Sequence, residues 1–327
     1  MSYTKSAVLP VSPDEAFALV TDPERLRRWQ VVAAYVDLRA GGEYRWTVSP
    51  GHTAGGTFKE IEPGRRVVYG WGWVGDNDLP PDASTVTITL EPTDGGTRVT
   101  LEHDGLTEQQ SAMHAEGWDH YFERLDKLVT AGDAGPDEWA WAPEHLDPVV
   151  ASEAVLAVIQ PVLRGLTAED QPKATPCPDF TCHELAMHLM GSMTGLGAMA
   201  GATIAMPEEG SLEHKVSTMA EQAIHSWRSV DLSGTVRIGG GHEMPAAVAA
   251  GILPVVLALH GWDLAQASGQ ELRISDEVVA YLRELAEVFV PGGRSNGSFG
   301  EEVEPAADAS AIDRLAAYAG RRPLVAA

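Results

Sequence analysis

Residues 97–130 read TRVTLEHDGLTEQQSAMHAEGWDHYFERLDKLVT, and the hydrophobic period changes within this stretch. Val99, Leu101 and His103 alternate with polar residues, which is typical of one face of a β-strand. From Glu108 to about Thr130 the apolar residues instead recur at helical spacing, and one side carries His114, Trp118, Tyr121, Leu125, Leu128 and Val129. A single amphipathic helix of this length can cover one curved antiparallel sheet. We therefore expect strands before residue 105 and one long helix that packs on them.

Earlier segments repeat the two-residue alternation, and turn residues such as Gly41-Gly42 and Pro63-Gly64 separate them. Before them, Ser12, Pro13 and Glu15 form a helix start with a cap, a first-turn proline and a capping-box glutamate. The strand faces and the long helix enclose either a packed core or a cavity. The residues that we expect to line a cavity are Trp46, Tyr69, Trp71, Trp73, His103, Trp118 and Tyr121. His103 with Asp104 and His114 with Glu116 are either acid–base pairs or a strand-end and a helix-surface histidine.

Several motifs in this part of the chain share one resemblance. They are Ser12–Phe17, Thr21–Trp29, Leu38–Tyr44, Tyr69–Trp71, Gly95–Leu101 and Gly117–Asp119. With them, residues 5–131 resemble the START-like helix-grip superfamily (SRPBCC), in the Aha-type branch related to the activator of the heat-shock-protein ATPase. The resemblance implies a cavity between sheet and helix that holds a hydrophobic small molecule. It predicts a fold much better than a substrate.

A polar break with Gly and Pro at residues 133–138 marks a domain boundary, as expected for a chain of 327 residues. We predict an N-terminal domain over residues 1–132, a linker over 133–146 and a C-terminal domain over 147–327. The C-terminal domain is mainly helical and has enough helices for a four-helix bundle. The fold class is therefore α+β, with a helix-grip domain followed by a helical bundle.

Two histidines in the C-terminal domain, His188 and His260, lie on different predicted helices. Two imidazoles from different helices of one bundle are the smallest set of ligands that could begin a metal site. A carboxylate would supply the third protein ligand. At helical spacing Glu184 shares a face with His188, and Asp263 shares a face with His260, so either is a candidate third ligand. Cys177 lies near a helix start, where it either has a lowered thiol pKa or is a small buried residue.

The motifs Thr175–Thr181, Glu184–Leu189 and Leu259–Gly269 are similar to those of the DinB-like superfamily, on the side of the mycothiol-dependent maleylpyruvate isomerases. The resemblance implies a divalent metal, zinc above all, held by residues matching His188 and His260 and by a Glu or His four residues before the latter. Here that position is Val256, which cannot ligate a metal. Either the bundle is metal-free, with Asp263 orienting His260, or Asp263 or Glu184 replaces the missing ligand, or two histidines bind metal weakly.

The composition excludes some partners. The chain has 47 acidic and 23 basic residues, and its net charge of -24 repels nucleic acid and anionic lipid surfaces. No apolar run long enough to span a membrane and no signal-peptide pattern appears, so we expect a cytoplasmic protein without a membrane or nucleic-acid partner.

The expected function is small-molecule handling. The N-terminal cavity would bind a hydrophobic compound, and the bundle would act as a metal- and mycothiol-dependent isomerase or transferase. The alternative is a non-catalytic binding or sequestration protein with a degenerate, metal-free bundle.

Overall fold

The structure is a computed structural model that describes residues 1–324, and the chain divides into two compact units, one up to Asp137 and one from Glu138 onward. The division falls inside the predicted linker, residues 133–146. Residues 135 and 136 belong to the first unit because Arg124 donates hydrogen bonds to the carbonyl oxygens of Gly135 and Pro136.

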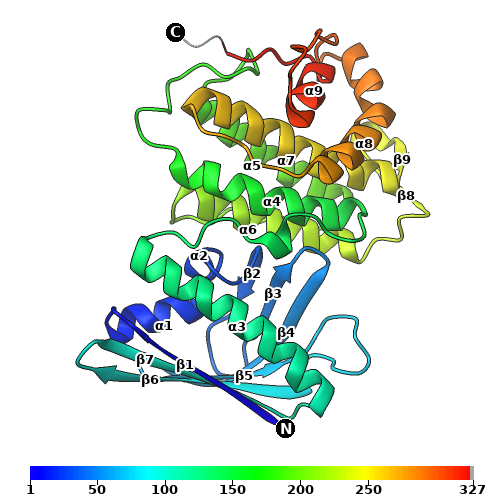
Figure 1. Cartoon of the computed structure of the whole chain (residues 1–327). Helices are drawn as coiled ribbons and strands as arrows, with labels where there is room; N and C mark the ends of the chain where they lie inside the picture. Colours follow the sequence, from blue (N-terminus) through cyan, green and yellow to red (C-terminus); the bar gives the residue numbers. More distant parts are fainter. Residues whose placement is uncertain (325–327) are drawn as a thin grey trace. The chain divides into compact units, whose positions relative to one another are not determined.

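The first unit is built on a seven-stranded antiparallel sheet (Figure 1). In chain order its strands are β1 (Ser2–Leu9), β2 (Ala33–Val36), β3 (Glu43–Ser49), β4 (His52–Glu62), β5 (Arg66–Trp71), β6 (Ser84–Thr93) and β7 (Gly96–Asp104). Their order across the sheet is β1-β7-β6-β5-β4-β3-β2. The first strand thus pairs with the last one, and Tyr3 lies opposite His103.

Helices α1 (Pro13–Thr21) and α2 (Pro23–Leu26) connect β1 to β2, and α3 (Glu108–Ala131) follows β7. A capping box between Thr107 and Gln110 begins α3, and Gly132 ends it with a φ of 82°, a left-handed conformation that favours glycine. The apolar side of α3 packs into the same core as the inner faces of the strands, through Trp118, Tyr121, Phe122, Leu125 and Leu128. A large antiparallel sheet gripped by one long helix is consistent with the helix-grip fold.

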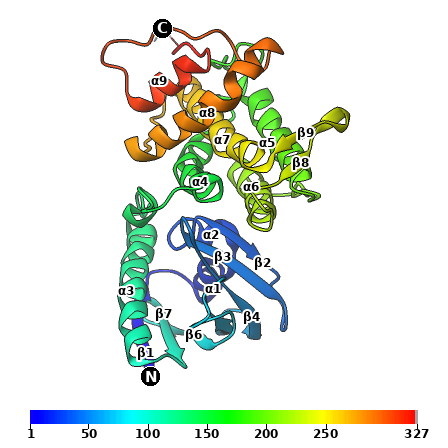
Figure 2. The same ribbon diagram turned by 90° about the vertical axis from the view of Figure 1, so that its right-hand side faces the viewer.

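The second unit is mainly helical (Figure 2). Its helices are α4 (Pro148–Gly165), α5 (Cys182–Met199), α6 (Leu212–Arg228), α7 (Ala246–Ser268), α8 (Asp276–Ser295) and α9 (Ala311–Tyr318). Both α4 and α5 pack against α6 and α7, while α8 packs against α7 and α9. Between α6 and α7 the chain forms a small hairpin of β8 (Thr235–Arg237) and β9 (Glu243–Pro245).

Helix α7 lies at the centre of this unit and is buried along most of its length. Its close approach to α4 depends on Gly261, because a Cβ there would lie only 2.4 Å from Cγ2 of Ile159. By length and composition α4 and α7 could each span a membrane, but 61% and 78% of their most apolar windows are buried inside the protein. Such burial is that of core helices in a soluble protein.

Candidate functional site

The seven side chains that we expected to line an N-terminal cavity lie together in the first unit. Six of them are buried and Trp73 is partly buried against the same core. The ring centroid of Trp71 lies 5.2 Å from that of Trp118, 5.5 Å from that of Trp73 and 6.3 Å from that of Trp46. Rings at these separations are in direct contact. The interior at this point is therefore a packed aromatic cluster.

His103 is fully buried in this cluster, and its hydrogen bonds determine its tautomer. An indole N–H only donates, so Nε1 of Trp118 donates to Nδ1 of His103 at 3.1 Å, and the ring proton lies on Nε2. Nε2 then donates to Oγ of Ser84 at 2.9 Å, and Ser84 donates to the carbonyl of Trp71. Burial, together with the nearby His114, lowers the pKa of His103 to about 3, which keeps the ring neutral.

His114 lies beside His103 and is buried, so its interpretation as a helix-surface histidine is wrong, whereas His103 does lie at the end of β7. Nε1 of Trp71 donates to its Nε2 at 3.2 Å, and its Nδ1 donates to the carbonyl of Gln110 at 2.8 Å. Burial lowers the pKa of His114 as well. Both imidazoles have all their hydrogen-bonding capacity used, which is the state of structural histidines rather than of an acid–base pair.

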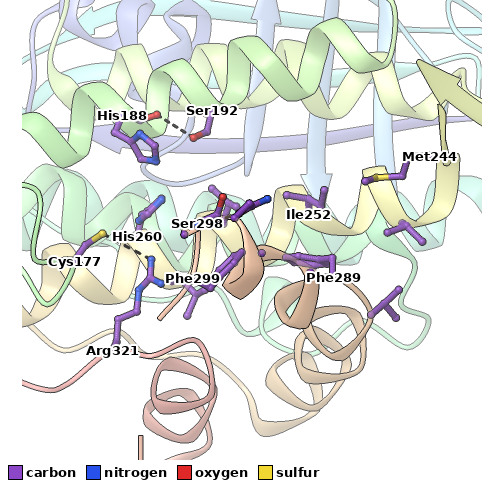
Figure 3. A pocket seen from close by; sticks show the side chains of 18 of the residues that line it. Cys177, His188, Ser192, Met244, Ile252, His260, Phe289, Ser298, Phe299 and Arg321 are labelled. Atoms are coloured by element: carbon purple, nitrogen blue, oxygen red, sulfur yellow. Dashed lines mark hydrogen bonds between the residues drawn. The ribbon is translucent and has the colours of Figure 1, made fainter. Parts of the chain in front are cut away.

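The second unit contains a pocket of about 870 Å³ between α5, α7, the C-terminal end of α8 and residues 177–180 (Figure 3). One face of α7 lines it through Val248, Ile252, Val256 and His260, which recur every four residues. Phe289 and Phe299 add aromatic surface on the side of α8. The pocket therefore has a long apolar wall that leads toward His260.

Polar side chains gather at one end of the pocket, which we call the polar end: Cys177, His188, His260 and Arg321 (Figure 3). The predicted pair of histidines is indeed together, because the two ring centroids lie 5.2 Å apart at nearly a right angle. His188 also stacks on Phe180 at 4.7 Å. Although His188 is exposed at the pocket, partial desolvation lowers its pKa, and the nearby His260 and Arg321 lower it further.

Asp263 lies behind the polar end and is fully buried. Its Oδ2 accepts a hydrogen bond from Nδ1 of His260 at 3.2 Å and lies 3.6 Å from Nε of Arg321. The carboxylate thus orients the imidazole from the side away from the pocket. This is the orienting role that the sequence left open for Asp263.

Glu184 caps the start of α5, and its hydrogen bonds go to Thr181 and not to the histidines. It is exposed at the first turn of α5, and its carboxylate accepts hydrogen bonds from the backbone N–H and the hydroxyl of Thr181, at 2.9 and 2.8 Å. These two bonds lower the pKa of Glu184. The side chain completes a capping box and is turned toward the helix start.

The candidate zinc ligands are His188, His260, Asp263 and Glu184. A catalytic zinc usually has three protein ligands. Within residues 1–324 no group of three or more His, Cys, Asp and Glu side chains is placed to hold a metal ion. The two histidines alone therefore do not complete such a site, Glu184 is used as a cap, and Asp263 holds the outer nitrogen of His260. Zinc binding stays a prediction, and so does the use of mycothiol.

Cys177 lines the pocket with its Sγ 3.9 Å from Nη2 of Arg321. Burial raises the pKa of this thiol in spite of the nearby guanidinium, so the helix start does not activate it. Arg321 itself was missed by the sequence analysis, since only tertiary folding brings it beneath α7. The apolar wall could have been found, because Val248, Ile252, Val256 and His260 share one helical face in the sequence.

Comparisons with known proteins find similarity to parts of the chain. A family model described as "Activator of Hsp90 ATPase homolog 1-like protein" matches residues 10–130. Two uncharacterized proteins of Mycobacterium tuberculosis, Rv0738 and MT0763, are 26% identical over 181 residues, which cover 54% of this chain and 98% of theirs. That aligned part is longer than the first unit, so at least some of it lies in the second.

Two solved structures are similar to part of the chain. CV1439 from Chromobacterium violaceum is 24% identical, with 39% of this chain and 96% of that chain covered and a TM-score of 0.34. CalU16 from Micromonospora echinospora is 27% identical, with 40% and 76% covered and a TM-score of 0.33. The family match over residues 10–130 supports an AHSA1-like domain in the first unit.

Proposed function

We propose that this protein binds a small organic molecule with an apolar body in the pocket of the second unit. The observation that carries the proposal is the shape and lining of that pocket. Its volume of about 870 Å³ lies within the range of small-molecule sites, which are mostly apolar with a few convergent polar groups. The apolar wall of α7 and the polar end supply these two parts.

The AHSA1-like domain supports the same broad function, because its family is associated with hydrophobic ligand binding. In the first unit, however, the residues that we expected around a ligand contact one another in the aromatic cluster. A ligand there would have to separate these rings. A ligand can enter the pocket of the second unit without such a rearrangement, so this pocket is our preferred binding site.

The finer parts of the function are also our proposals. The mutual packing of α4, α5, α6 and α7 supports a DinB-like four-helix bundle. Isomerase or transferase activity with zinc and mycothiol would need ligands beyond His188 and His260, such as a chelating substrate. Elemental analysis of the purified protein tests the metal: near-stoichiometric zinc that is lost in a His188→Ala, His260→Ala double variant would support it, and zinc-free protein after reconstitution would contradict it.

The binding proposal is tested with the neutral fluorescent probe N-phenylnaphthylamine. We expect single-site binding to the full chain, and Ile252→Trp to weaken it at least about tenfold because the indole fills the apolar part of the pocket. Met206→Trp places the same side chain at an exposed position of the second unit and should leave binding unchanged. Equal binding by both variants, each shown to be folded by circular dichroism, would contradict the proposal.

A further inference from the structure

The charges around the pocket are distributed unevenly. Among the described residues that line it, Arg321 is the only Lys or Arg, and its exposed fraction is 7%. The acidic lining residues, Asp179 and Glu243, are exposed and so lie toward solvent. The carboxylate that balances Arg321, that of Asp263, does not line the pocket. The polar end therefore offers a ligand one buried guanidinium, while Asp179 beside Cys177 is exposed to solvent and Asp263 lies outside the lining, in a protein whose net charge is -24.

Arg321 is held in place rather than free to swing. Gly320 turns the chain after α9 with a φ of 85°, and a Cβ there would lie 2.5 Å from Cα of Gly300, so the turn requires glycine. Nη1 of Arg321 donates to the carbonyl of Ala319 at 3.1 Å. Nε faces Asp263 at 3.6 Å and Nη2 makes the long contact with Cys177. The guanidinium has five N–H donors, so some remain for a ligand in a fixed orientation.

His260 offers a hydrogen-bond acceptor, whereas Arg321 offers donors. An ionised carboxylate only accepts hydrogen bonds, so Asp263 fixes the proton of the neutral ring on Nδ1. Nε2 is then an acceptor, and no protein donor within residues 1–324 bonds to it. His260 and Arg321 both contact the same oxygen of Asp263, so this acceptor and the guanidinium are neighbours.

We propose that the pocket takes an amphipathic hydroxy acid, and this rests on the proposed function above. The ligand's carboxylate lies on Arg321, its adjacent hydroxyl donates to Nε2 of His260, and its apolar chain follows Val248, Ile252 and Val256. From Val248 to His260 the wall extends for about 18 Å along α7, at the usual rise per helical residue. That length accommodates a medium-length hydrocarbon chain.

Displacement of N-phenylnaphthylamine from the full chain tests the head group. The competitors are α-hydroxydecanoate, decanoate and decanol, which share one apolar chain. We expect the hydroxy acid to bind at least about tenfold more tightly than the alcohol, because a hydrogen bond to a charged group is among the stronger ones, and decanoate to lie between the two. Arg321→Gln should remove the preference for the acids and leave decanol binding unchanged.

Arg322→Gln is the matched control, since Arg322 is the next residue and is exposed. It should keep the full preference. Should Arg321→Gln fail to fold, Arg321→Lys keeps the charge without the planar fork and should show a reduced preference. Decanol that binds as tightly as the acids, or a preference that survives Arg321→Gln, would overturn this inference while leaving the binding function intact. Absence of probe binding to the unmodified protein would instead overturn the proposed function itself.

Discussion

His103 shows how a single buried polar residue can be structural. Its two ring nitrogens pair with Trp118 and Ser84. Removal of the imidazole leaves the buried indole N–H of Trp118 without its partner, while the Ser84 hydroxyl keeps only its bond to the Trp71 carbonyl. We expect His103→Leu to lower the free energy of unfolding by about 1–3 kcal/mol, the usual cost of unsatisfied buried polar groups. Urea unfolding followed by tryptophan fluorescence measures this.

His52→Leu provides the comparison at the same scale, because His52 is exposed in the same unit. A surface substitution of this kind changes stability by less than about 0.5 kcal/mol. If the two variants were equally stable, the hydrogen bonds of His103 would contribute nothing, and its burial would be incidental.

At the scale of an element, the start of α5 distinguishes a cap from a metal ligand. Thr181 and Glu184 satisfy each other's backbone N–H groups, so Thr181→Ala should lower the free energy of unfolding by about 1 kcal/mol, a typical value for a lost N-cap. Glu184→Gln retains the capping box and should keep both stability and ligand binding near those of the unmodified protein. Loss of bound metal in Glu184→Gln, measured by elemental analysis, would show that Glu184 is a ligand after all.

At the scale of the whole molecule, two effects of acid oppose each other. The net charge of -24 becomes smaller as carboxylates are protonated, which relieves repulsion in the folded protein. The buried histidines act in the other direction. The pKa of His103 is about 3 in the folded state against 6.5 for the ordinary side chain. Between these two pH values, His103 is protonated in the unfolded chain and neutral in the folded protein. The stability that the neutral ring contributes is present above about pH 6.5 and is lost as the pH falls toward 3.

We therefore expect the unmodified protein to lose more stability than His103→Leu when the pH is lowered from about 7 to about 5, although the variant is less stable at neutral pH. The effect of net charge is common to both proteins, so the difference between their urea midpoints isolates the histidine. A parallel pH dependence of the two midpoints would show that His103 does not resist protonation.

The elements were largely predictable, and the C-terminal boundary of α3 differs from the expected one by about a residue, because caps and period are local signals. The pairing of His188 with His260 was also predictable, since each lies on a strongly helical segment with a distinct motif. The role of Glu184 was not: its spacing suits a ligand and a cap equally well, and only the direction of its carboxylate decides between them.

By itself the sequence determined the order of strands and helices, the AHSA1-like character of residues 10–130 and the chemical inventory of the second unit, because these depend on local period, capping and motif. Tertiary structure alone decided which groups meet. It brought the aromatic rings of the N-terminal unit into contact, buried His114, and placed Arg321 beside Asp263, although 58 residues separate Arg321 from Asp263 in the chain. Contacts between distant residues depend on how the helices pack in three dimensions, which no local pattern encodes.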